Sequence, residues 1–123
     1  LLRYLSIMGP LLVAAARHGA FDPAVWTAAQ QDAANRNFDQ TLDVVSAQAD
    51  QYTTLLGDMT DEDFRVEIEM FGRRATRGSF LVNTVLCGYA AYRTQLFLYL
   101  KACGRHELGT MNLWGGMDAT PAS

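Results

Sequence analysis

Few side chains in this chain of 123 residues combine a type and a spacing that could support catalysis. The two histidines, His18 and His106, stand at the end of one predicted helix and beyond the end of another, so we expect no third ligand beside them. The cysteines Cys87 and Cys103 have no histidine at helical spacing that could activate a thiolate. The sequence therefore contains neither a Ser-His-Asp nor a Cys-His arrangement.

The two cysteines lie sixteen residues apart in one predicted helix, so their Cα atoms would be roughly 24 Å apart. That separation is far beyond the roughly 7 Å that a disulfide can span. Two isolated thiols fit a reducing compartment, and we interpret both as small residues of the core rather than as reactive groups.

An acidic cluster and the overall charge bear on the partners. The acidic residues could bind a hard cation, although a solvated acidic surface is the favoured interpretation; they are Asp61, Glu62, Asp63, Glu67 and Glu69. The chain has 10 basic and 13 acidic residues and no basic stripe interleaved with aromatic residues. We therefore expect no nucleic-acid partner.

The longest candidate helix runs from Thr76 to Gly104 and contains no proline. Its apolar residues return at helical spacing, which predicts one long, largely buried helix that ends at Gly104. A second helix is predicted over Leu1–His18, with Gly19 as its end and with Arg17 and His18 in the last turn, where a cation suits the helix dipole. Pro10 predicts a kink in that helix or a restart of it.

Two further helices are predicted between these. Asp22 and Pro23 form a strong start signal for a short helix that carries Trp26 as a core anchor. The segment 36–56 repeats apolar residues at spacings of four and three, which is typical of a bundle helix; these residues are Phe38, Leu42, Val45, Ala49, Tyr52 and Leu56.

The remaining segments are shorter. Thr60 and Asp63 have the spacing of a weak capping box, which predicts a single helical turn after Gly57. The segment 65–78 alternates apolar and acidic residues, but a lone strand has no partner, so we expect an extended connector followed by a mobile basic loop. Leu113 and Trp114 are expected to dock back on the helices.

These elements predict an all-α fold: a single domain over residues 1–123 in which three main helices form an up-down bundle. A fourth helix would come from a segment preceding Leu1 or from a partner subunit. The sequence contains no run of about 18 apolar residues and no signal-peptide pattern in its first twenty residues. We therefore expect a cytoplasmic protein that is not inserted in a membrane.

Two segments carry a resemblance to a known family. LLRYL at the start of the chain and GYAAYRTQLFLYLKACG from Gly88 are similar to two segments of the DinB family, which have patterns like LLxHL and HxxxHRxQLxxYL. The DinB family comprises four-helix bundles and includes the YfiT-like metal-dependent hydrolases and thiol-dependent transferases. The resemblance implies a DinB-like bundle whose first helix is missing here or supplied by a partner.

The resemblance also assigns three metal-ligand positions, and none of them carries a histidine. In the family, three imidazoles would hold a divalent Ni²⁺ or Zn²⁺ ion with positions left open for water. Here the positions are Tyr4, Gly88 and Tyr92. Glycine has no side-chain ligand, and tyrosine, with a reference pKa of about 10, is a poor ligand at neutral pH. We therefore expect no metal and no cofactor.

Three functions remain open. The first is a metal-free bundle with a central pocket lined by Tyr4, Tyr89, Tyr92 and Arg93, which either binds a small ligand or is a satisfied polar core. Arg93 either binds an anion there or pairs with Glu67 or Glu69. The second is a metal-dependent hydrolase or thiol S-transferase of the DinB/YfiT type. The third is an interaction module acting as a homodimer, because the apolar stripes are broader than a three-helix monomer could cover.

Overall fold

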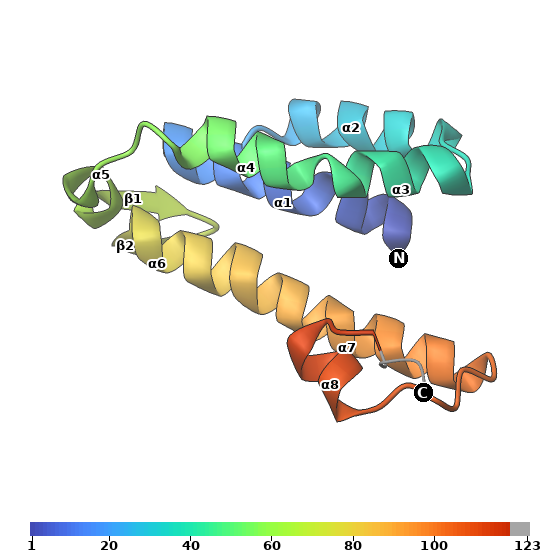
Figure 1. The fold of residues 1–123 in the computed structure, drawn as a ribbon. Coiled ribbons are helices and arrows are strands. Elements are labelled where there is room, and N and C mark those ends of the chain that lie inside the picture. Colours follow the sequence, from blue (N-terminus) through green and yellow to red (C-terminus); the bar gives the residue numbers. More distant parts are fainter. Residues whose placement is uncertain (119–123) are drawn as a thin grey trace. The chain divides into compact units, whose positions relative to one another are not determined.

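The computed structural model describes residues 1–118, and helices make up 72% of the structure, with one two-stranded sheet (Figure 1). The prediction of an all-α fold is therefore confirmed at the level of composition. The chain divides into two compact units, the first covering Leu1–Gly88 and the second beginning at Tyr89. The two units are described separately below.

Helix α1, Leu2–His18, is the central element of the first unit. It packs against five other elements. They are α2 (Pro23–Asn35), α3 (Phe38–Ser46), α4 (Gln48–Leu56), α6 (Arg77–Phe80) and the π-helical η1 (Leu81–Leu86). Eight of its residues are buried, including Leu5, Met8 and Val13. The helix runs without a break through Pro10, and it ends as predicted at Gly19, whose left-handed backbone lets its N–H reach Ala15 O at 2.8 Å.

The short helix after Asp22 is confirmed. Helix α2 spans Pro23–Asn35, and the Asp22 carboxylate accepts a hydrogen bond from Ala24 N at 2.8 Å. The long helix predicted over 36–56 is instead two helices, α3 at Phe38–Ser46 and α4 at Gln48–Leu56. Between them Ala47 has ψ −6°, which turns the chain away from the α-helical path.

The buried face of α3 and α4 differs from the predicted apolar stripe. The fully buried residues are Thr41 and Gln48, at 2% and 5% exposure, whereas Phe38 is 64% exposed. Gln48 is accepted in the core because its Nε2 donates to Leu5 O of α1 at 2.8 Å. The predicted stripe is therefore only partly correct: Phe38, Leu42 and Ala49 are exposed. Its other three members, Val45, Tyr52 and Leu56, are half-buried.

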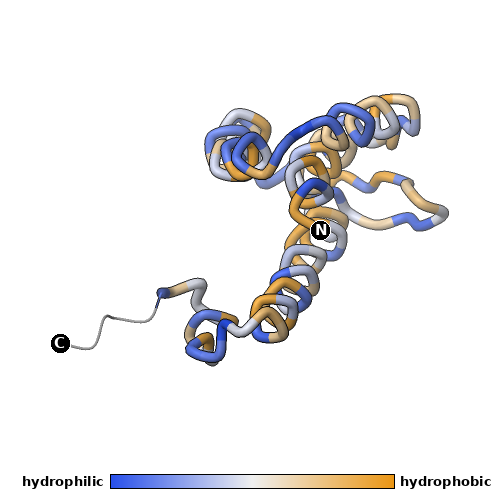
Figure 2. The backbone as a smooth tube through the Cα atoms, turned by 90° about the vertical axis from the view of Figure 1, so that its right-hand side faces the viewer, coloured by the Kyte–Doolittle hydropathy of each residue, from blue (hydrophilic) through white to orange (hydrophobic). Residues whose placement is uncertain are grey.

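The segment after the capping box forms a hairpin, so the predicted lone connector and basic loop are wrong. Helix α5, Asp61–Arg65, has the predicted box of Thr60 and Asp63. Strands β1, Glu67–Met70, and β2, Arg73–Thr76, then pair antiparallel with Met70 opposite Arg73. Hydrophobic and hydrophilic residues follow one another along this hairpin in Figure 2. Strand β1 was expected to lack a partner, but it pairs with β2, which follows it directly in the sequence.

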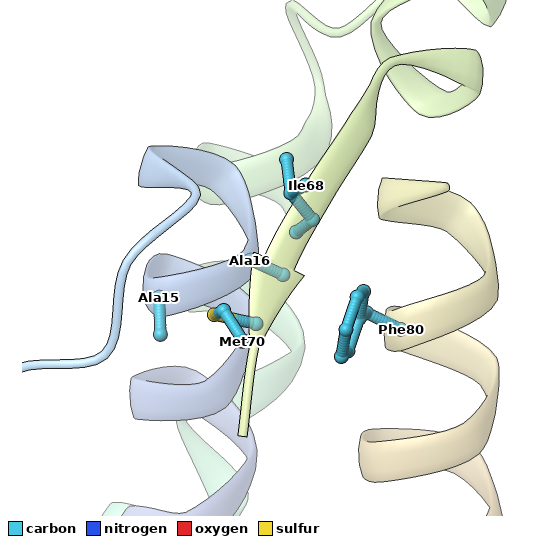
Figure 3. Packing of buried hydrophobic residues seen from close by; sticks show 5 residues of the cluster. All are labelled: Ala15, Ala16, Ile68, Met70 and Phe80. Atoms are coloured by element: carbon cyan, nitrogen blue, oxygen red, sulfur yellow. The ribbon is translucent and has the colours of Figure 1, made fainter. Parts of the chain in front are cut away.

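Two alternate residues of β1 complete the core of the first unit. Ile68 and Met70 are buried, at 9% and 5% exposure, and they form one cluster with Ala15 and Ala16 of α1 and with Phe80. Figure 3 shows the strand between α1 and the helix that carries Phe80, with the aromatic ring turned toward the strand. Strand β1 therefore contributes side chains to the core between these two helices at one end of the unit.

The segment after the hairpin is helical as predicted. It consists of α6, Arg77–Phe80, a π-helical stretch η1, Leu81–Leu86, and α7, Cys87–Ala102. It begins with a hydrogen bond from Ser79 N to Thr76 Oγ1, and the chain turns at Gly104, which has φ +96°. The prediction of a largely buried helix is wrong, because only Phe80 and Val85 are buried and no residue of α7 is.

The second unit consists of most of α7 and a short helix α8, Thr110–Gly115. Lys101 Nζ joins the two by donating to Leu108 O at 3.0 Å. Leu113 is half-buried, but Trp114 is 72% exposed, so the predicted docking of the tryptophan is wrong. Over the described residues, no helix is both long and apolar enough to cross a membrane.

Candidate functional site

Tyr4, the first candidate pocket residue, lies on the side of α1 that faces α2. Its half-buried ring meets the ring of Trp26 edge-on, with centroids 6.0 Å apart and an interplanar angle of 66°. Edge-to-face pairs of this kind are a favoured aromatic geometry. Tyr4 also borders a shallow depression with Arg3, Ile7 and Ala33. Within the first unit, this tyrosine is thus part of the contact between α1 and α2.

Gly88, the second candidate ligand position, packs against Met8 of α1. A β-carbon built on Gly88 would lie 3.5 Å from both Sδ and Cε of Met8, which is ordinary van der Waals contact. Met8 is only 1% exposed, so its thioether fills the space in front of the glycine. A longer side chain at position 88 would have to displace it.

The direction of this packing follows from a second contact in the same unit. Arg77 Nε donates to Ala16 O at 2.9 Å, near the end of α1, whereas Gly88 meets Met8 near its middle. The segment 77–88 therefore runs antiparallel to α1. Because Gly88 has no side chain, the backbone of this segment can lie close to α1 at Met8.

Tyr89, Tyr92 and Arg93 belong to α7 in the second unit. Both tyrosines are half-buried and Arg93 is exposed. Their role as pocket residues together with Tyr4 stays a prediction.

The donor set at the family's ligand positions does not fit Ni²⁺ or Zn²⁺. It offers no imidazole nitrogen, and Gly88 offers no side chain at all. His18 is exposed in the last turn of α1, as predicted, and His106 is exposed after Gly104. Over residues 1–118, no group of three or more His, Cys, Asp or Glu side chains is placed to hold a metal ion.

Two residues of the acidic cluster, Asp63 and Glu67, have local partners. Asp63 accepts from Thr60 N at 2.7 Å, and these hydrogen bonds from Thr60 hold the pKa of the Asp63 carboxyl below its usual value. Glu67 accepts from Arg74 Nε across the hairpin at 3.0 Å. Glu67 thus has a cross-strand partner, Arg74, and the pairing of Arg93 with Glu67 or Glu69 stays a prediction.

An arginine clamp holds the end of α1, and the sequence did not predict it. Arg17 pairs with Asp58 through both guanidinium nitrogens, with Nη2 to Oδ2 at 2.8 Å, and Nη1 also donates to Leu55 O. The hydrogen bond and charge of Arg17 hold the pKa of the Asp58 carboxyl below its usual value, and the pKa of Arg17 is raised in turn. The last-turn arginine therefore ties α1 to the end of α4 rather than only capping its own helix.

A row of four aromatic rings crosses the first unit and was also missed. Tyr4 contacts Trp26, Trp26 contacts Phe21 at 5.6 Å, and Phe21 contacts Phe71 at 5.1 Å between ring centroids. The residues come from α1, α2, the turn between them and the tip of the hairpin. Trp26 was predicted as an anchor, but its partner Tyr4 lies 22 positions away, and Phe71 lies 50 positions after Phe21. Both separations are beyond the range of a periodic pattern.

Cys87 and Cys103 are both free and exposed, so the interpretation of both as core residues is wrong.

Comparisons with known proteins identified no relationship. No family model, no curated protein and no solved structure matches this chain. The functional argument therefore depends on the residues described above.

Proposed function

We propose that the protein is a metal-free member of the DinB-like helical bundles and acts by binding a small molecule rather than by metal-dependent catalysis. The observation that carries this proposal is the contact of Met8 with Gly88. At the position where the family resemblance implies a metal-binding imidazole, the chain has a glycine, and a buried thioether fills the space in front of it.

The packing and the donor chemistry support the same conclusion. A histidine at position 88 would place its ring where Met8 now lies, and overpacking of a filled core costs about 1–3 kcal/mol. Tyr4 and Tyr92, at the other two positions, offer phenol oxygens and no nitrogen ligand. Such oxygens donate and accept hydrogen bonds but are weak ligands for Zn²⁺ or Ni²⁺.

In this proposal the ligand is held by the hydroxyls of Tyr4, Tyr89 and Tyr92, and Arg93 supplies a guanidinium for a carboxylate or phosphate group. We also propose that the protein is cytoplasmic and forms a homodimer through its helices. The alternative, a metal-dependent hydrolase or thiol S-transferase of the DinB/YfiT type, requires nitrogen ligands that these positions lack.

The direct test is elemental analysis of the purified protein, followed by calorimetric titration with Ni²⁺ and with Zn²⁺. The expected result is no stoichiometric metal and no saturable binding heat. Stoichiometric metal with micromolar or tighter binding would overturn the proposal and favour the hydrolase or transferase. Light scattering would test the homodimer separately.

A gain-of-site experiment tests the family resemblance itself. The variant Tyr4→His, Gly88→His, Tyr92→His also carries Met8→Ala, which makes room for the new ring. The resemblance predicts that it binds one Ni²⁺ or Zn²⁺ ion. The control places the third histidine at Ala91 and keeps Tyr92, which rotates that imidazole by about 100° around the helix. A folded variant that binds no better than the control would contradict the DinB-like arrangement.

A further inference from the structure

A separate pocket opens in the first unit between the last turns of α1 and the start of α2. Its volume is about 400 Å³, and its lining includes Leu11, Ala14, His18, Phe21, Asp22 and Trp26. Small-molecule sites usually have volumes of about 300–1,000 Å³ and are mainly apolar with a few polar groups. This pocket has both properties, and it contains none of the residues Tyr89, Tyr92 or Arg93.

The charge of the lining favours a cation. Asp22 is the one carboxylate among the nine lining residues, and none of the nine is a lysine or an arginine. The Asp22 side chain is fixed in position, since its Oδ1 accepts from Ala24 N at 2.8 Å and from Val25 N at 3.4 Å. The neighbouring cation, Arg17, is paired with Asp58. His18 is the other titratable group in the lining.

The aromatic walls favour an organic cation over a metal ion. Phe21 and Trp26 both line the pocket, and their ring centroids are 5.6 Å apart with an interplanar angle of 51°. The face of an aromatic ring attracts a cation through its quadrupole, and tryptophan does so best. The apolar floor of Leu11 and Ala14 suits methyl or methylene groups on the same ligand.

The hairpin tip supplies a second observation. Phe71 has φ +54°, a left-handed backbone that is unusual for a bulky residue, and its ring lies 5.1 Å from that of Phe21. Phe71 is the first residue of the two-residue hairpin turn, and Asn or Gly is favoured there when φ is positive. The phenylalanine is thus poor for the turn, but it places a ring behind one wall of the pocket.

We propose that this pocket binds a small organic ammonium ion, with Trp26 and Phe21 as the aromatic walls and Asp22 as the countercharge. Phe71 is a positioning residue that supports Phe21. The lining shares no residue with the proposed tyrosine-lined pocket, so either proposal can fail alone.

The test is a titration of the intact chain with choline and with its neutral isostere, in which a tert-butyl group replaces trimethylammonium. The two tryptophan indole N–H resonances are followed by NMR. Trp26 lies in the pocket, and Trp114, in the second unit, is the internal control. We expect a saturable shift of Trp26 alone and about tenfold weaker binding of the neutral isostere. Equal binding of both probes, or no shift of Trp26 at millimolar concentrations, would overturn the proposal.

Matched variants separate the effect of the Asp22 charge on binding from its effect on folding. Asp22→Asn keeps an effective helix cap and removes the charge, so choline affinity should fall about fivefold while binding of the isostere is unchanged. Asp39→Asn makes the same change of charge on α3, outside the pocket lining, and should leave the affinity unaltered. Phe71→Asn suits the turn and removes the supporting ring, so affinity should fall while thermal stability is kept. An Asp22→Asn variant that binds choline normally would contradict the role of the countercharge.

Discussion

Helices α1 and α7 are similar in length and both contain many apolar residues, but they differ in how many of their residues are buried. Eight residues of α1 are buried, and α1 contacts helices on several sides. No residue of α7 is buried, and Leu98 and Tyr99 are 59% and 52% exposed. The apolar spacing had predicted that the long helix over 76–104 is largely buried.

The difference shows what an apolar period can and cannot indicate. A spacing of three and four residues indicates that a helix has an apolar face, but it contains no information on which element covers that face. In α1 the small residues Ala15 and Ala16 are buried because β1 and Phe80 reach them from positions more than fifty residues later. The predictions below test whether this difference between α1 and α7 holds in solution.

The largest expected effect comes from removing matched apolar side chains from the two helices. Met8→Ala in α1 should lower the free energy of unfolding by about 2–5 kcal/mol, because it opens a cavity beside Gly88. Leu98→Ala in α7 should change it by less than about 0.5 kcal/mol, because that side chain is mainly exposed. Urea unfolding measures both. Equal losses would mean that the α7 face is covered in solution, as a homodimer through this helix requires.

The polar contact of α1 with α4 should give the next largest effect. Gln48→Ala removes the buried hydrogen bond to Leu5 O and should lower the free energy of unfolding by about 1–3 kcal/mol. Gln51→Ala, at an exposed position of the same helix, is the control. Thermal unfolding of both variants compares them. If Gln51→Ala were the more damaging change, the assigned inward face of α4 would be incorrect.

Gly88 lies where the packed part of the long helix meets α7. Gly88→Ala should raise the free energy of unfolding by about 0.5–1 kcal/mol, because alanine is the better helix former and the added β-carbon meets Met8 at 3.5 Å. Gly88→Leu should lower it by overpacking against Met8. Chemical unfolding distinguishes the two. A stabilising Gly88→Leu change would show that Met8 does not fill this space.

The smallest expected effect concerns the clamp at the end of α1. The pKa of Asp58 is lowered in the folded state by Arg17, so its contribution to stability is present above the unfolded pKa of about 4 and is lost as the pH falls through the folded value. Unfolding measured between about pH 5 and pH 3 should therefore be less pH-dependent in Asp58→Asn than in the wild type. A residual dependence should remain from Asp63, whose pKa is also lowered. Identical pH profiles would mean that the ion pair with Arg17 is absent in solution.

Part of the candidate sites could be predicted from the sequence. Trp26 was recognised as an anchor, whereas the assignment of Tyr4, Gly88 and Tyr92 as ligand positions rests on the family resemblance and stays a prediction. Met8, Phe21 and Phe71 were not connected with any site. Their roles depend on contacts with Gly88, Trp26 and Phe21, and none of these pairs follows from a helical or strand period.

The sequence by itself determined the elements that depend on neighbours within about four residues. Asp22 with Pro23 begins α2, Thr60 with Asp63 begins α5, and Gly19 ends α1, because each cap is a hydrogen bond or a backbone angle within one turn. Only the tertiary structure decided the packing of β1 against Ala15 and Ala16, the inward face of α3 and α4, and the burial of α1 rather than α7. Burial is set by contacts between residues that are distant in sequence. A local pattern does not indicate which distant residue will make the contact.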